Sequence, residues 1–128
     1  MIVDSSAVVA ILCREKGHEE LIRKLAAADT AAMTAPVAFE AAMVLTLKLR
    51  RDGLALLNDF LVEGGVVLTP FAPEHTSAAL GAYLRYGKGR HPAGLNFGDC
   101  LSYAAAKVAG QPLLYVGDDF DKTDIAAA

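Results

Sequence analysis

Short apolar runs alternate along the chain with longer segments in which apolar residues recur at helical spacing. The short runs predict strands at residues 1–4, 31–34, 66–69 and 112–116. The longer segments predict helices near residues 7–13, 18–28, 35–51, 54–63, 73–85 and 98–108. No Asn-Gly hairpin signal joins two strands, and the strands are continuous Val, Leu and Ile runs. The pattern therefore predicts an α/β fold whose parallel sheet of four or five short strands is flanked by helices.

Length and composition indicate one folded domain that does not span a membrane. The chain has 128 residues, 54% of them hydrophobic and 21% charged, so we expect residues 1–128 to form a single folded domain. No apolar run reaches the roughly 18–20 residues of a membrane span. Asp4 stands where a secretory signal would carry positive charge, and Cys13 and Cys100 have no motif spacing. We expect a cytoplasmic protein that does not enter a membrane.

Acidic residues follow two of the predicted strands. Asp4 comes directly after the first strand, and Asp118 and Asp119 follow the last one. Ligands of open parallel sheets bind outside the carboxyl ends of the strands, which is where these residues fall. Taken singly, a helix cap at Asp4 and a solvated loop at Asp118 and Asp119 explain the residues about equally well.

Two further acids begin helices that are otherwise apolar. Glu40 is the one carboxylate in the early turns of a helix that is apolar on every side, and a carboxylate buried alone must pair or take up a proton. Asp99 opens a second, almost wholly apolar helix, where capping alone would account for it. Both helix starts lie on the sheet edge that carries the strand ends, so we expect the acids to converge.

Converging carboxylates repel one another unless a cation or a proton compensates their charge. Ligand sets made only of oxygen favour Mg²⁺ or Mn²⁺, and the chain has no His or Cys residues at metal-ligand spacing. A site of this kind activates water and stabilises the charge that develops on a phosphodiester. A metal-dependent phosphodiesterase is therefore the leading hypothesis from the residues alone.

Several motifs resemble PIN-domain ribonucleases of the VapC toxin type. They are Met-Ile-Val-Asp-Ser-Ser-Ala at 1–7, Glu-Ala at 40–41, Asn-Phe-Gly-Asp-Cys at 96–100, Leu-Leu-Tyr-Val-Gly-Asp-Asp-Phe at 113–120 and Thr-Asp-Ile at 123–125. The resemblance covers essentially the whole chain, in order. It implies a three-layer PIN-like domain that is the toxin component of a type II toxin-antitoxin system.

This resemblance also implies an activity and its site residues. The activity is Mg²⁺- or Mn²⁺-dependent endonucleolytic cleavage of structured RNA, either tRNA or rRNA. The implied catalytic residues and metal ligands are Asp4, Glu40, Asp99 and Asp118, supported by Ser6, Asn96, Asp119 and Thr123. Whether Asp118 or Asp119 supplies the fourth carboxylate stays open, as do the number of metal ions and the RNA sequence. The implied partners are RNA, a second copy of the chain and a VapB-type antitoxin.

Charge bears on the RNA hypothesis in two ways. Twelve Lys and Arg against fifteen Asp and Glu give a net charge of −3, which by itself disfavours nucleic acid as a partner. If Asp4, Glu40, Asp99 and Asp118 are set aside as metal ligands, the remaining net charge is +1 instead of −3. Arg85, Lys88 and Arg90 lie in or beside a loop rich in Gly and Pro, and we expect them to contact RNA phosphates.

Competing functions fit the motifs less well. A haloacid-dehalogenase-like phosphatase needs a second acid where this chain has Ser6, a receiver domain needs an acid pair on the first strand, and a Rossmann module needs a Gly-rich turn after it. A non-catalytic binding or dimerisation module, in which the acids are helix caps, remains the alternative from a different class.

Overall fold

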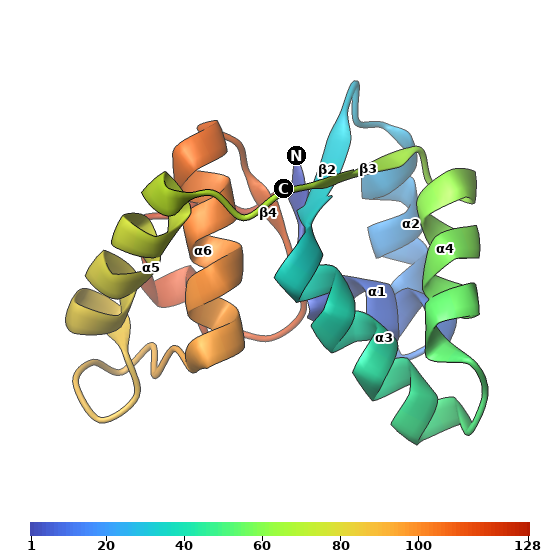
Figure 1. The fold of residues 1–128 in the computed structure, drawn as a ribbon, viewed down its shortest axis with the longest axis horizontal. Helices are drawn as coiled ribbons and strands as arrows, with labels where there is room; N and C mark the ends of the chain where they lie inside the picture. The colour runs from blue at the N-terminus through green and yellow to red at the C-terminus, as the bar shows by residue number, and fades with distance from the viewer.

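A computed structural model describes residues 1–128, and Figure 1 shows its helices and strands. Helices and strands alternate, as the apolar pattern predicts. The helices are α1 Ser5–Leu12, α2 His18–Ala26, α3 Ala35–Leu49, α4 Gly53–Glu63, α5 Pro73–Tyr86 and α6 Phe97–Ala109. The strands are β1 Ile2–Val3, β2 Ala31–Thr34, β3 Val66–Thr69 and β4 Leu113–Leu114. None of the helices has the length and apolar composition needed to cross a membrane.

The strands form one parallel sheet in the order β3-β2-β1-β4. Ile2 pairs with Leu113 in the register of β1 and β4, and Ala31 pairs with Val66 in that of β2 and β3. The predicted α/β fold with a parallel sheet is confirmed. A single parallel bridge between Leu113 and Ala127 stands where a fifth strand would lie.

The last strand is shorter than predicted. The apolar run from Pro112 to Val116 indicates five residues, but only Leu113 and Leu114 pair as a strand. The backbone N–H of Val116 instead donates to the hydroxyl of Ser6, at 3.0 Å. The chain therefore leaves the sheet after β4 and bends toward the start of α1.

Helices cover both faces of the sheet, so that the molecule has two apolar cores. In Figure 1, α1 to α4 lie on one side of the strands and α5 and α6 lie on the other. Val3 and Leu114 face the larger core, whereas Ile2 and Leu113 face the smaller one. Because alternate residues of a strand point to opposite faces, both cores require apolar side chains, which explains the unbroken apolar runs.

An ionic contact holds the end of the chain against α5 and α6. The carboxylate of Asp124 accepts hydrogen bonds from Tyr103 Oη at 2.6 Å and Lys107 Nζ at 2.9 Å. The guanidinium of Arg85 lies 3.6 Å from the same carboxylate. The Tyr103 and Lys107 hydrogen bonds are the main cause that lowers the pKa of Asp124 to about 2. The segment after β4 is thereby fixed to the smaller core.

We expect Asp124→Asn to lower the melting temperature at neutral pH, because the folded state loses its preference for the ionised carboxylate. The pKa of Asp124 falls from its ordinary 3.8 to about 2 on folding, so its stabilising contribution is complete above about pH 5 and disappears as the pH falls toward 2. The melting temperatures of the original chain and of Asp124→Asn, measured from pH 2 to pH 7, should become equal at the acid end. Asp59→Asn, on the exposed face of α4, is the control and should keep the melting temperature of the original chain. A difference between Asp124→Asn and the original chain that stays constant with pH would contradict the expectation.

Candidate active site

Asp4 is a buried carboxylate held by two serines. It follows β1, caps the N-terminus of α1 and is only 4% exposed. Its Oδ2 accepts hydrogen bonds from the backbone N–H of Ser6, at 2.9 Å, and from the Ser6 hydroxyl. Its Oδ1 accepts a hydrogen bond from the hydroxyl of Ser102 on α6. Asp4 therefore has one fixed orientation at the carboxyl edge of the sheet.

Glu40 lies on α3 where that helix passes α6. The side chain is half-buried, and burial together with the nearby charge of Asp4 raises its pKa. A Cβ atom at Gly98 would lie 2.6 Å from Glu40 Oε2 and 2.7 Å from Oε1. The absence of a side chain at Gly98 therefore leaves room for the Glu40 carboxylate between the two helices.

Asp99 is positioned by the N-terminus of α6. Asn96 Oδ1 accepts a hydrogen bond from the backbone N–H of Asp99, and Asp99 Oδ2 accepts one from the backbone N–H of Asn96, both at 2.9 Å. This reciprocal pair is a capping box. Burial raises the pKa of Asp99 to about 6, against the lowering effect of the Asn96 bond and with further contributions from the charges of Asp4, Asp119 and Glu40. The structure thus brings Asp4, Glu40 and Asp99 within electrostatic reach of one another, and Asn96 acts by capping.

The structure separates the two acids that follow β4. Asp118 is exposed and lies 3.6 Å from the ammonium group of Lys122. Asp119, rather than Asp118, contributes to the raised pKa of Asp99. Asp119 is therefore better placed than Asp118 to complete the acidic group, and the sequence alone did not distinguish them.

Thr123 has a local role in the structure. Its hydroxyl donates to the carbonyl of Phe120 at 2.8 Å and accepts from the backbone N–H of Ile125 at 3.2 Å. These bonds close the turn after the short 3₁₀ helix Phe120–Lys122. No hydrogen bond joins Thr123 to Asp4, Glu40, Asp99, Asp118 or Asp119. The hydrogen bonds of its hydroxyl are those of a turn.

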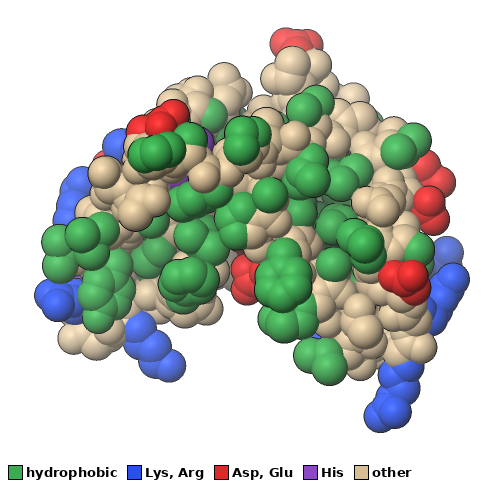
Figure 2. All heavy atoms as spheres, viewed as in Figure 1, with side chains coloured by type: hydrophobic (Ala, Val, Ile, Leu, Met, Phe, Trp, Pro, Cys, Tyr) green, Lys and Arg blue, Asp and Glu red, His purple; other side chains and the backbone are tan.

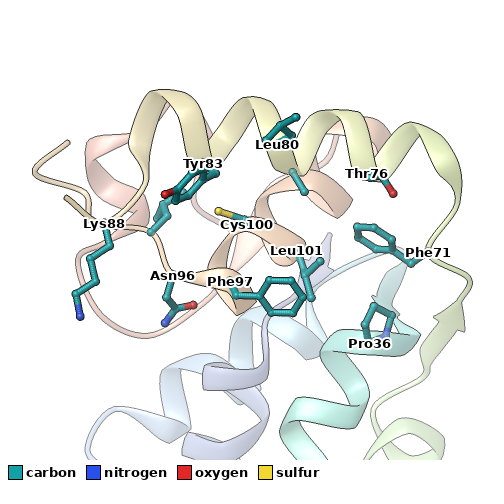
Figure 3. A pocket seen from close by; sticks show the side chains of 12 residues that line it. Pro36, Phe71, Thr76, Leu80, Tyr83, Lys88, Asn96, Phe97, Cys100 and Leu101 are labelled. Carbon is teal, nitrogen blue, oxygen red and sulfur yellow. The ribbon is translucent and has the colours of Figure 1, made fainter. Parts of the chain in front are cut away.

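The three basic residues expected to contact RNA differ in their surroundings. Arg85 is engaged by Asp124 and lies over the ring of Tyr86 at 4.8 Å. Arg90 is exposed, with its guanidinium 5.0 Å from the ring centre of Tyr83. Lys88 is exposed, forms no ion pair, and extends away from the hollow that it lines in Figure 3. Lys88 and Arg90 are therefore the cations still available to a ligand.

Two apolar hollows flank the acids. In Figure 2 a red carboxylate lies in the groove between the two halves, with hydrophobic side chains on both sides. One hollow, of about 830 Å³, lies between α5, α6 and the start of α3 and includes Phe97 (Figure 3). The other, of about 570 Å³, lies along α3 and α4 and includes Phe39. Phe39 is 70% and Phe97 81% exposed. The sequence analysis described both helices as apolar and did not identify these exposed rings.

Ser102 is the other residue that sequence reasoning missed. It is completely buried and touches Asp4 across 98 positions of sequence. The available signal was its spacing, because Ser102 stands one helical turn after Asp99 in an otherwise apolar helix. That spacing puts both side chains on the same side of α6.

The donor chemistry of this site fits a hard divalent cation, although its side chains are not arranged as a finished metal cage. No three His, Cys, Asp or Glu side chains surround one point as ligands would. All the candidate ligands are carboxylates, however, and burial, with a smaller contribution from mutual repulsion, raises the pKa of Glu40 and of Asp99. Asp99 Oδ1 has no hydrogen bond, so it can accept a cation without loss of the cap. The fit to a hard cation therefore rests on the chemistry of the donors, which are all oxygen atoms.

Comparisons with known proteins agree with this geometry. The PIN domain model matches residues 1–126. The chain is 45% identical to Ribonuclease VapC36 of Mycobacterium tuberculosis over 98% of this chain and 91% of that protein. It is 44% identical to Ribonuclease VapC of Mycolicibacterium smegmatis, over 99% and 98%. Mycobacterium tuberculosis VapC20, described as a sarcin-ricin loop cleaving toxin, superposes with a TM-score of 0.79 over 99% of this chain and 97% of its own; at 15% identity this shows a shared fold.

We expect Asp99→Asn to stabilise the protein in the absence of metal at neutral pH. Burial and three neighbouring acids disfavour the Asp99 carboxylate, while an asparagine oxygen can still accept the bond from Asn96. A gain of about 1 kcal/mol would raise the melting temperature by roughly 4 °C in a domain of this size. Differential scanning calorimetry in EDTA measures the change. Asp118→Asn, which removes only an exposed ion pair, should leave it unchanged, and a destabilised Asp99→Asn would refute the account.

Proposed function

The chain belongs to the PIN domain family, and on that premise we propose that it is the toxin of a type II toxin-antitoxin system, acting as a metal-dependent endoribonuclease. The observation that carries the proposal is the group of four carboxylates, Asp4, Glu40, Asp99 and Asp119, beside the carboxyl ends of β1 and β4. Burial, together with the charges of the other three acids, raises the pKa of Asp99 to about 6. Such crowding is costly to a folded chain unless a cation offsets it.

These carboxylates would hold Mg²⁺ or Mn²⁺. The bound ion would activate water for attack on phosphorus and offset the charge that develops on the phosphodiester. The chain itself supplies the rigidity: Ser6 and Ser102 fix Asp4, the capping box fixes Asp99, and the close passage of α3 and α6 confines Glu40. Such rigidity favours catalysis because little reorganisation is needed when charge develops.

We propose that the substrate is a structured RNA, either tRNA or rRNA. The similar proteins named above are ribonucleases, and VapC20 is described as cleaving the sarcin-ricin loop. On this chain, Lys88 and Arg90 are exposed beside the larger hollow and can bind the phosphates that flank the cleaved bond. Arg85 is held by Asp124 and contributes less.

The proposal includes two protein partners, a second copy of the chain and a VapB-type antitoxin. Exposed apolar side chains are concentrated in the two hollows, among them Leu80 and Phe97 in one and Phe39 and Leu54 in the other. Large apolar patches of this kind are uncommon on proteins that act alone. We place the activity in the cytoplasm, in keeping with two unpaired cysteines.

A matched pair of variants tests the acidic site and its fourth member. We expect Asp119→Asn to lower the Mg²⁺- or Mn²⁺-dependent cleavage rate at least about 100-fold, the scale on which loss of one charged catalytic group acts. Asp118→Asn, one residue away and turned toward Lys122, should keep a rate within a few-fold of the original chain. Gel analysis of purified tRNA and rRNA, with and without EDTA, measures both.

The reverse ranking of the two variants would assign the fourth acid to Asp118. Cleavage that persists in EDTA would overturn the metal-dependent mechanism. A chain that cleaves neither RNA and whose melting temperature does not rise with Mn²⁺ would instead favour the non-catalytic module, because a ligand that binds the folded state must stabilise it.

A second test concerns Lys88 and Arg90. We expect Lys88→Ala and Arg90→Ala each to weaken RNA binding and to reduce the slope of log affinity against log salt by about 0.7–0.9, the effect of one lost phosphate contact. Arg23→Ala is the control, since Arg23 pairs with Glu20 on α2. Fluorescence anisotropy in Ca²⁺, at several salt concentrations, gives the slopes, and unchanged slopes for both loop variants would remove this loop from the RNA interface.

A further inference from the structure

Ser102 is the one fully buried polar side chain that contacts an acid of the site. It lies on α6, has no exposed surface, and donates its hydroxyl hydrogen to Asp4 Oδ1. Asp4 is also almost completely buried, so this bond is shielded from water. Bonds of this kind to ionised acceptors are about twice as strong as those between neutral groups.

The hydrogen bonds of Asp4 leave a defined part of its carboxylate free. An ionised carboxylate has about four lone-pair positions, two on each oxygen. Two donors from Ser6 occupy Oδ2, namely its backbone N–H and its hydroxyl. The Ser102 hydroxyl occupies one position on Oδ1. One acceptor position remains, and it is on Oδ1.

We propose that Ser102 is a positioning residue that makes Asp4 a ligand through one oxygen only. This inference rests on the proposed function, since it concerns how the acidic site receives its divalent cation. With Ser6 and Ser102 both in place, two-oxygen coordination by Asp4 would require breaking a buried hydrogen bond. Ser102 thus determines how much of the Asp4 carboxylate stays free: one acceptor position, on Oδ1, would be left to hold a cation.

The position of Ser102 on α6 also couples Asp4 to Asp99. The two residues stand one helical turn apart, so the same helix that carries Asp99 aims the hydroxyl at Asp4. Through this contact the geometry between two proposed ligands, one after β1 and one at the start of α6, is set by a single rigid element. Such supporting contacts commonly change metal affinity by about 10- to 100-fold.

A purely structural role for Ser102 makes a different forecast. If its hydroxyl only satisfies a buried carboxylate, its removal lowers the stability of the metal-free protein but leaves the affinity of the folded protein for a cation unchanged. Mn²⁺ affinity therefore separates the two roles, and it can be measured without RNA or catalysis.

The test is Mn²⁺ titration of the full chain and of Ser102→Ala, followed by the electron paramagnetic resonance signal of free Mn²⁺. We expect Ser102→Ala to bind Mn²⁺ about 10- to 100-fold more weakly while its circular dichroism stays that of the original fold. Thr34→Val is the matched control: Thr34 lies at the carboxyl end of β2, is 2% exposed, and its hydroxyl has no hydrogen-bond partner. Its affinity should be unchanged.

Each outcome bears on a separate claim. Equal Mn²⁺ affinity in the original chain and in Ser102→Ala would overturn the role of Ser102 and leave the proposed function standing. No Mn²⁺ binding by the original chain would overturn both. An equal loss of affinity in Thr34→Val would also overturn the specific role. If Ser102→Ala does not fold, Ser102→Cys, which has a somewhat larger side chain and only a weak S–H donor, replaces it in the same comparison.

Discussion

Burial of the Asp4 carboxylate is the constraint on which the arrangement of the site depends. Removing a carboxylate from water is unfavourable unless hydrogen bonds replace those lost, and Asp4 is only 4% exposed. Its donors come from α1 and from α6, and Ser6 in turn receives the backbone N–H of Val116 after β4. Satisfying one side chain therefore ties together the two halves of the molecule at the edge of the sheet.

The remaining acids add an opposing effect. Asp99 and Glu40 both have raised pKa values because burial and neighbouring carboxylates disfavour their ionised forms. The apolar cores, the capping box and the ionic contact at Asp124 must outweigh this repulsion in the metal-free protein. The acidic site thus lowers the stability of the metal-free protein, and perturbed pKa values of this kind are common at functional sites.

Much of the fold was predictable because its signals are local. The strands at 31–34 and 66–69 have their predicted bounds, since each is a continuous apolar run that pairs along its whole length. The strand at 112–116 was overestimated, because the Val116 N–H is taken by Ser6, a residue 110 positions away. The same limit applies to the site: periodicity brings Asp4, Glu40 and Asp99 to one edge, but only the folded loop turns Asp118 toward Lys122. The spacing of Ser102 from Asp99 places both side chains on one side of α6, but it does not reveal that the partner of Ser102 is Asp4, 98 positions away.

The many apolar residues of the helices lie either in a core or on the surface, and the hydrophobic pattern of the sequence does not distinguish the two. Helix α3 is apolar on every side, yet Val37 and Leu45 are buried in a core while Phe39 and Leu47 lie exposed in a hollow. A residue that faces its own core and one that awaits a partner obey the same periodicity, because both are withdrawn from water in their final state. Figure 2 shows apolar side chains on both sides of the carboxylate in the groove, so apolar surface borders the approach to the acids. If the proposed function holds, a protein partner that covers either hollow would therefore also narrow the access of RNA to the carboxylates.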